Sequence, residues 1–233
     1  MIPFKDNVPS RLFPVITVVL ILANVAAFLY EMSLPSAVLD DFFFSYGIVP
    51  YRLQVSGQSL IPLFAYMGSS LVTAMFLHGG FIHLLGNIWY LWIFGGSIED
   101  RMGPFRFLLF YLLCGILAGG VQVLFNLNSR IPTIGASGAV AGVLGAYLIS
   151  YPLARVSTLL PFLIVWPVVE LPAMLLLGFW FFVQLLNGTA SIGAASGMTG
   201  GVAWWAHIGG FLSGVILIWL FAREPARRDY LKG

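Results

Sequence analysis

Six apolar stretches, each long enough to cross a lipid bilayer as a helix, limit the possible folds of this chain more than any other feature. A helix needs roughly 17–25 largely apolar residues to span the hydrocarbon core. Of the 233 residues, 60% are apolar and 9% are charged, whereas a soluble domain carries about 25% charged residues. We therefore predict an all-α, polytopic membrane protein with six transmembrane helices, at about residues 13–31, 80–97, 105–125, 133–151, 171–187 and 201–222.

The predicted spans divide the chain into three parts. Residues 1–12 form a short N-terminal segment, residues 13–222 form the six-span domain, and residues 223–233 form a basic tail. Inside the domain, a long first outer loop over residues 32–79 joins the first two spans. A later loop, residues 187–201, contains five glycines and no charge. We expect that loop to act as a gate, together with the fifth span.

The stretch between the fourth and fifth spans, residues 155–170, is apolar but is not predicted to cross the membrane. Pro161 and Pro167 would break a helix there. Glu170 would be costly at the bilayer centre. We therefore expect an interfacial or re-entrant segment instead of a seventh crossing.

The distribution of lysine and arginine predicts the orientation. With six spans, both termini lie on the same side as the loops at residues 98–104 and 152–170. That side holds nine of the eleven basic residues, and Arg52 and Arg130 fall on the other. Because basic loops face the cytoplasm, we predict that both termini are cytoplasmic.

Four polar side chains inside the predicted spans are candidates for function, because each costs free energy in the membrane. They are His83 and Asn87 in the second span, Ser137 in the fourth and His207 in the sixth. Counted from the expected start of each span at about 1.5 Å per residue, all four lie roughly 5–10 Å below the outer surface. His83 and Asn87, four residues apart, also share one helix face. The four residues are therefore expected to line one water-filled indentation.

Ser137 and His207 have the chemistry of a nucleophile and a base. A serine in a membrane helix usually bonds to its own helix, so the prediction rests on the four residues together. Histidine suits the removal of a hydroxyl proton near neutral pH. We assign Ser137 as nucleophile and His207 as general base, and we expect His83, Asn87 and backbone N–H groups near Ser137 to stabilise an oxyanion. We expect a dyad with no acidic third member, because the candidate carboxylates map to loops or interfaces: Glu31, Asp40, Asp41, Glu99, Asp100 and Glu170. We assign Gln184 to interhelical bonding.

Glycines flank both candidate residues. The sequence GASGAVAGVLGAY surrounds Ser137, and AHIGGFLSG surrounds His207. Small residues at four-residue spacing allow two membrane helices to approach backbone to backbone. We therefore predict close packing between the fourth and sixth spans, which would bring Ser137 and His207 within hydrogen-bonding range.

Other kinds of site are not indicated. Cys114 is the only cysteine, so no disulfide framework can form. His78 and His83 are five residues apart and turn to different faces, and no nearby carboxylate completes a metal site. A net charge of +2 does not indicate a nucleic-acid partner. A transporter would be expected to show inverted repeats, and none is visible. We expect no cofactor, metal or nucleic acid.

Four sequence blocks resemble the signature blocks of rhomboid intramembrane serine proteases. They are HGGFIHLLGN at residues 78–87, GGSIEDRMG at 95–103, GASGAVAG at 135–142 and AHIGGFLSG at 206–214. They occur in the order found in that family and extend over the whole six-span core. The combined match is specific, although GASG alone would be weak.

The resemblance implies a function and assigns roles. It implies that the protein cleaves single-span membrane proteins near the outer end of their transmembrane helix, without a metal or cofactor, in a bacterial cytoplasmic (inner) membrane. Ser137 and His207 match the catalytic pair, His83 and Asn87 match the oxyanion-stabilising residues, and Gly135 lies in the loop before the serine. An alternative is a catalytically inactive rhomboid-like protein that binds membrane clients.

One position departs from the family pattern. Some bacterial rhomboids carry a tyrosine four residues after the serine, where it stacks on the catalytic histidine, whereas this chain has Ala141. The tryptophans Trp204 and Trp205 are candidates to take over that contact.

Overall fold

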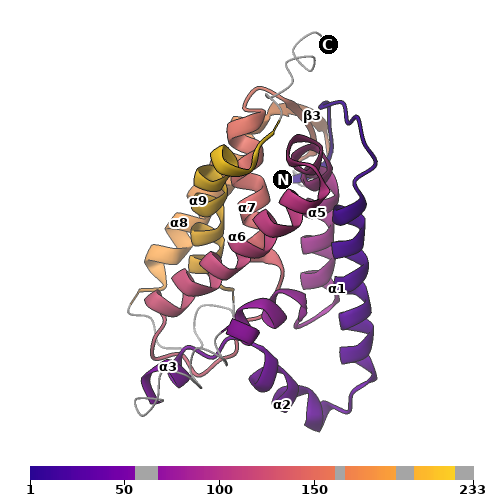
Figure 1. Ribbon diagram of the computed structural model, residues 1–233. Coiled ribbons are helices and arrows are strands. Elements are labelled where there is room, and N and C mark those ends of the chain that lie inside the picture. Colours follow the sequence, from indigo (N-terminus) through magenta and orange to yellow (C-terminus); the bar gives the residue numbers. More distant parts are fainter. Residues whose placement is uncertain (56–67, 161–165, 193–201, 224–233) are drawn as a thin grey trace.

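The computed structural model describes residues 1–55, 68–160, 166–192 and 202–223. Each of the six stretches predicted to span the membrane contains one helix (Figure 1). All of them except α7, which has 14 residues, are long and apolar enough to cross a bilayer. The polytopic, helical membrane fold is therefore confirmed. The helices are α1 (Val15–Ser33), α5 (Phe81–Met102), α6 (Pro104–Phe125), α7 (Ser137–Ser150), α8 (Ala173–Ala190) and α9 (Trp204–Phe221).

The remaining elements are short and lie at the two ends of the bundle (Figure 1). At one end lie the helical segments α2 (Ser36–Tyr46) and α3 (Tyr51–Val55) and the 3-10 turn η1 (Ala74–Phe76). At the other end is a small sheet made of β1 (Ile2–Asp6), β2 (Arg155–Leu159) and β3 (Val168–Pro172).

Helix α7 forms the centre of the bundle. Every residue from Gly138 to Tyr147 is buried, and α7 packs mainly against α9 and α6. In contrast, the outward faces of α1, α6 and α9 expose large apolar side chains such as Leu22, Leu124 and Trp219. Because an apolar surface of this extent is stable only in lipid, these faces are the ones that contact the bilayer.

Glycines set the distance between α7 and α9, as the sequence predicted. A Cβ atom placed on Gly210 would collide with the carbonyl oxygen of Gly138, and one on Gly214 would collide with that of Gly142. A Cβ on Gly142 would lie 2.5 Å from the Cβ of Cys114 in α6 and 3.3 Å from the carbonyl oxygen of Gly210 in α9. The backbones of α7 and α9 are thus in direct contact, which is possible only without side chains at these positions.

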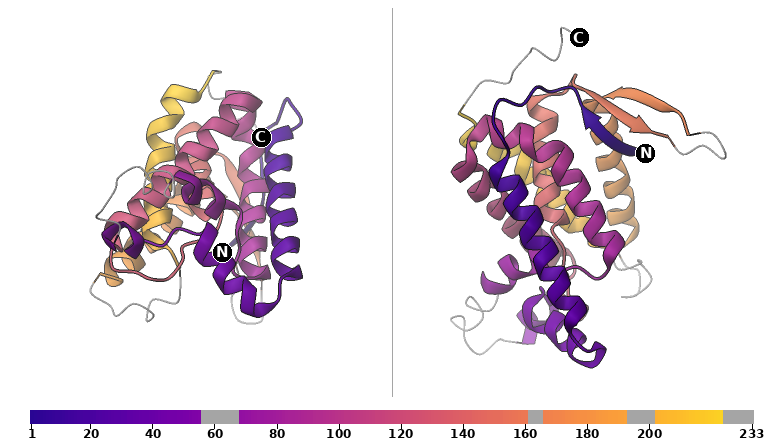
Figure 2. Two further views of the ribbon diagram at one scale, coloured as in Figure 1. Left: turned by 60° about the horizontal axis from the view of Figure 1, so that its bottom comes forward. Right: turned by 90° about the vertical axis from the view of Figure 1, so that its right-hand side faces the viewer.

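The stretch at residues 155–170, predicted as an interfacial or re-entrant segment, contributes two strands to a small sheet, which the sequence pattern did not predict. Strand β2 pairs antiparallel with both β1 and β3, and Figure 2 shows the three strands at one end of the bundle. Alternating residues of β2, Val156 and Thr158, are fully buried, a period of two that favours strand over helix. Residues 161–165, which include Pro161, lie outside the described structure.

The segment before α1 and the residues after α9 both contact the C-terminal end of α5. The Arg11 backbone N–H donates to the Asp100 carboxylate at 3.3 Å, and the Arg223 backbone N–H donates to the Arg101 carbonyl at 3.0 Å. Residues 11 and 223 therefore lie near the same end of α5. Most of the basic tail, residues 224–233, lies outside the described residues.

Glu99 joins α5 to the first turn of α1. Its carboxylate accepts hydrogen bonds from the backbone N–H groups of Ile16 and Thr17 and from the Thr17 hydroxyl, each at 2.8 Å. The sequence pattern predicts Glu99 in a loop or interface, but α5 extends to Met102, and Glu99 lies within this helix with 2% of its surface exposed. The first N–H groups of a helix have no partner inside that helix, so Glu99 caps α1.

Candidate active site

Ser137 and His207 lie in direct contact. The Ser137 Oγ atom is 2.8 Å from the His207 Nε2 atom, a hydrogen-bonding distance. Ser137 is the first residue of α7, and His207 lies in the first turn of α9. The contact depends on the glycine-mediated approach of these two helices, because a wider spacing would separate the two side chains.

The start of α7 differs from the prediction, which placed it at Thr133. Thr133 instead pairs with Ile48 in an isolated antiparallel bridge, and the Gly135 N–H donates to the Ala74 carbonyl at 2.8 Å. Gly135 has φ of 123°, a conformation that L-residues rarely adopt and that ends the extended segment. The helix therefore begins four residues after the predicted start. The backbone N–H groups of its first turn, around Ser137, have no partner within the helix.

Gly135, two residues before Ser137, lies against His83 and Asn87 of α5. A Cβ on Gly135 would lie 2.6 Å from His83 Nε2 and 3.7 Å from Asn87 Nδ2. The loop that leads into α7 therefore packs against both side chains of α5. Only glycine permits this approach, because any side chain would push the His83 imidazole away.

His78 orients the Asn87 amide, a role that the sequence analysis did not identify. The Asn87 Nδ2 atom lies 3.0 Å from His78 Nε2, and His78 Nδ1 lies 3.2 Å from the Phe76 carbonyl oxygen. Because a carbonyl can only accept, Nδ1 carries the proton and Nε2 accepts from Asn87. The spacing of nine residues between His78 and Asn87 crosses a helix start, so periodicity gives no signal for this contact.

His207 makes a second hydrogen bond on its far side. Its Nδ1 atom lies 2.8 Å from Gln184 Oε1 in α8, which confirms the predicted interhelical role of Gln184. The rings of Trp180 and Trp204 lie near the imidazole, with centroid distances of 6.0 and 6.2 Å. Trp205, the other candidate, stacks on Phe125 at 3.7 Å instead.

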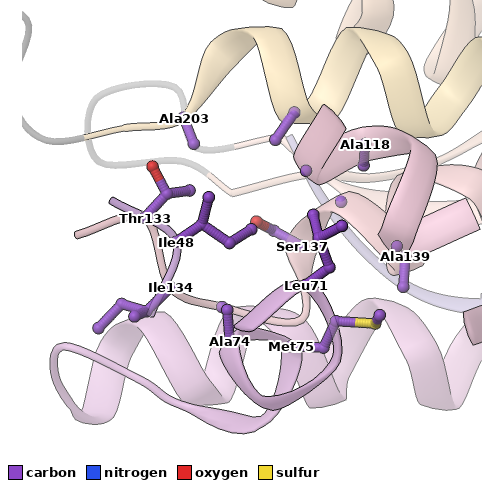
Figure 3. A pocket seen from close by; sticks show the side chains of 15 residues that line it. Ile48, Leu71, Ala74, Met75, Ala118, Thr133, Ile134, Ser137, Ala139 and Ala203 are labelled. Carbon is purple, nitrogen blue, oxygen red and sulfur yellow. The ribbon is translucent and has the colours of Figure 1, made fainter. Parts of the chain in front are cut away.

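A small cavity lies beside Ser137. Its volume is about 20 Å³, which is enough for about one water molecule. Figure 3 shows Ser137 next to apolar lining residues, among them Ile48, Leu71 and Ala74. The rest of the lining consists largely of glycine and alanine, including Gly115, Gly119, Gly138, Ala203 and Ala206.

Comparison with known proteins identifies related sequences. Residues 66–224 match the family model described as the Rhomboid domain. RHOMBOID-like protein 6, mitochondrial, of Arabidopsis thaliana is 35% identical over 155 residues, which cover 66% of this chain and 44% of the relative. Rhomboid-like protein 11, chloroplastic, from the same plant is 33% identical over 161 residues, covering 66% and 53%.

A bacterial relative is similar over a shorter region. Rhomboid protease GluP of Bacillus subtilis (strain 168) is 44% identical over 78 residues, which cover 34% of this chain and 15% of the relative. The chain spans about half the length of the first two plant relatives. The family match, in contrast, covers well over half of the chain. On this ground, together with the fold, the chain is a member of the rhomboid family.

Proposed function

We propose that this protein is an intramembrane serine endopeptidase that cleaves single-span membrane proteins near the outer end of their transmembrane helix. The observation that carries the proposal is the 2.8 Å contact between Ser137 Oγ and His207 Nε2 inside a membrane-embedded helix bundle. Membership of a family that includes a protein named as a protease supports it.

The contact suits acyl transfer. His207 Nε2 takes the proton of the Ser137 hydroxyl while Oγ attacks the carbonyl carbon of the scissile peptide bond. The tetrahedral intermediate then collapses: the C–N bond breaks, and the imidazolium gives its proton to the leaving amine. Water attacks the resulting ester in the same way, with His207 again as the base, which releases the carboxylate product and restores Ser137.

Fixed donors around Ser137 suit the negative charge that develops on the carbonyl oxygen. The backbone N–H groups at the start of α7 have no partner within that helix. His78 accepts one N–H of the Asn87 amide, which leaves the second N–H available, and His83 borders the same loop. We assign these groups to oxyanion stabilisation, with Gly135 as the residue that lets them approach.

The short central helix supports the proposed depth of the site. Its 14 residues are about 21 Å long, whereas the hydrocarbon core is about 30 Å thick. A helix of this length that ends near the sheet would place Ser137 about 9 Å below the opposite surface. We infer six crossings with both termini in the cytoplasm, because described basic residues gather at the sheet end: Lys5, Arg11, Arg101, Arg106, Arg155 and Arg223.

The membrane in which the protein resides is a separate matter. The comparisons support a multi-pass integral membrane protein, and the relatives that they name include mitochondrial and chloroplastic proteins as well as a bacterial one. They therefore do not support the bacterial inner membrane in particular. The alternative of an inactive client-binding protein is not favoured, because Ser137 and His207 are both present and in contact.

The test is cleavage of a single-span reporter in liposomes by purified protein. We expect cleavage by the unmodified protein and none by Ser137→Ala or His207→Ala. Ser213→Ala is a matched control, because the Ser213 hydroxyl bonds to the carbonyl of Gly209 in its own helix at 2.7 Å and does not contact the candidate site. Cleavage by Ser137→Ala at the rate of the control would refute the proposal.

A further inference from the structure

The hydrogen bond between Gln184 and His207 bears on which ring nitrogen of the imidazole carries the proton. A base that must accept a proton at Nε2 has to carry its own proton on Nδ1. In many serine hydrolases a carboxylate enforces this tautomer. Among the described residues, the side-chain hydrogen bonds of His207 go to Ser137 and Gln184 and not to any carboxylate.

The orientation of the Gln184 amide follows from its second contact. The Gln184 Nε2 atom donates to the Trp180 carbonyl oxygen at 3.2 Å, one turn earlier in α8. Because that oxygen can only accept, the NH₂ group must face it, and the amide oxygen must then face His207. Gln184 is 5% exposed, so little water competes for either contact.

The amide oxygen in turn determines the tautomer of His207. At 2.8 Å from Nδ1, a group that can only accept requires a proton on Nδ1. The unprotonated nitrogen is then Nε2, which lies 2.8 Å from Ser137 Oγ. A chain of hydrogen bonds from the Trp180 carbonyl through Gln184 and His207 thus directs a lone pair at the Ser137 hydroxyl.

Aromatic contacts do not fix the imidazole in the same way. The ring of Trp180 is tilted by 34° to it, with the centroids 6.0 Å apart, and Trp204 lies edge-on at 6.2 Å. A closely stacked pair in the same protein, Phe125 and Trp205, has its centroids 3.7 Å apart. The position from which a tyrosine would stack on the histidine is occupied by Ala141.

We propose that Gln184 is a positioning residue that holds His207 with Nδ1 protonated and Nε2 directed at Ser137, in place of a carboxylate or a stacked tyrosine. This proposal rests on the proposed protease function. Among the described residues, the ionisable side chain that interacts electrostatically with His207 is His83 of α5. The proposal assigns Gln184 no contact with substrate.

Two substitutions separate positioning from packing between helices. Gln184→Met keeps the size of the side chain but removes the acceptor, and Gln184→Glu keeps an acceptor at the same place and adds a negative charge. Asn187→Ala is the control, because Asn187 is another α8 amide that bonds to its own helix, at Val183 O and 2.8 Å, without contacting His207.

The experiment measures kcat and KM for reporter cleavage in liposomes from pH 5 to 9. We expect Gln184→Met to lower kcat about tenfold, the effect of losing one hydrogen bond at the upper end of the usual range, with KM unchanged. Gln184→Glu should recover kcat, and the acidic limb of its pH profile should move to higher pH, because a nearby negative charge favours the imidazolium. Asn187→Ala should match the unmodified protein.

The results distinguish this inference from the proposed function. If Gln184→Met keeps full kcat and an unchanged pH profile while Ser137→Ala is inactive, the protease assignment holds and the positioning role is wrong. If Gln184→Met does not fold, the pH profile of Gln184→Glu decides: an unmoved acidic limb overturns the inference. Cleavage by Ser137→Ala would instead refute the function on which it rests.

Discussion

Replacement of Gly135 by alanine should lower both the catalytic rate and the stability of the protein, through two separate effects. The new Cβ would lie 2.6 Å from His83 Nε2 and 2.7 Å from His83 Cε1, whereas Cβ atoms essentially never come within 3.0 Å of another heavy atom. The atoms it meets belong to the end of a side chain, so the imidazole can move away while the backbone stays in place. The substitution therefore displaces His83 from the edge of the candidate site.

The expected magnitudes follow from two separate effects. The backbone at Gly135 has φ of 123°, and holding an alanine in such a region costs about 1–3 kcal/mol of stability. Displacement of one oxyanion donor typically costs about a hundredfold in kcat, or about 2.7 kcal/mol of transition-state stabilisation. KM should change little, because the donor acts on charge that develops only in the transition state.

The assay compares reporter cleavage in liposomes and thermal unfolding in detergent for Gly135→Ala and Gly79→Ala. Gly79 is a suitable control because a Cβ there would meet only Ile134 Cδ1, at an ordinary 3.8 Å. We expect the control to retain both activity and stability. If Gly135→Ala kept the kcat of the unmodified protein, the assignment of His83 and Gly135 to oxyanion stabilisation would be wrong.

Three further predictions concern stability and are measured by thermal unfolding in detergent. Gly210→Ala should lower the free energy of unfolding by about 1–3 kcal/mol, through overpacking of α7 on α9. Gly178→Ala is the control, because a Cβ there meets nothing within 4 Å. Equal effects of the two substitutions would contradict the packing of α7 on α9. Glu99→Ala should cost about 2–5 kcal/mol by leaving N–H groups of α1 without a partner, whereas Glu170→Ala, which removes an ion pair with side chains 57% exposed, should stay within about 1 kcal/mol. Burial raises the pKa of Asp6 above its ordinary 3.8. The contribution of Asp6 to stability is therefore greatest below pH 3.8 and declines as the pH rises through the raised pKa. Asp6→Asn should remove that decline, and an unchanged pH dependence of stability would contradict this role of Asp6.

Hydropathy alone located the helices, because a stretch of about twenty apolar residues has few alternatives to a membrane helix. It could not locate the start of α7. Residues 133–135 carry no charge or proline that would mark a helix start. Thr133 nevertheless pairs with Ile48, 85 positions earlier, in a contact that no local pattern records. The small sheet was missed for a similar reason: on one side β2 pairs with β1, which lies near the N-terminus and far from β2 in the sequence.

The sequence indicated the candidate site residues, but it did not indicate most of the interactions that hold them in place. Ser137, His207, His83 and Asn87 stood out because polar side chains are rare in the spans. The capping of α1 by Glu99 joins residues more than 80 positions apart, and the sequence analysis had assigned that carboxylate to a loop. Gln184 was recognised as an interhelical residue, but its partner became evident only from the three-dimensional arrangement of α8 and α9. The glycine-rich loop predicted as a gate falls mostly on residues 193–201, outside the described structure.

The most direct test of the account is reaction of the membrane-embedded protein with a serine-reactive fluorophosphonate, followed by mass spectrometry of the labelled peptides. Attack by Ser137 Oγ on phosphorus expels fluoride and passes the hydroxyl proton to His207, so the reagent reports the activated nucleophile without the need for a known substrate. We predict a single adduct on Ser137, with labelling lost in Ser137→Ala and strongly slowed in His207→Ala. An adduct on a different residue, or labelling of His207→Ala at the rate of the unmodified protein, would contradict the assignment of this pair.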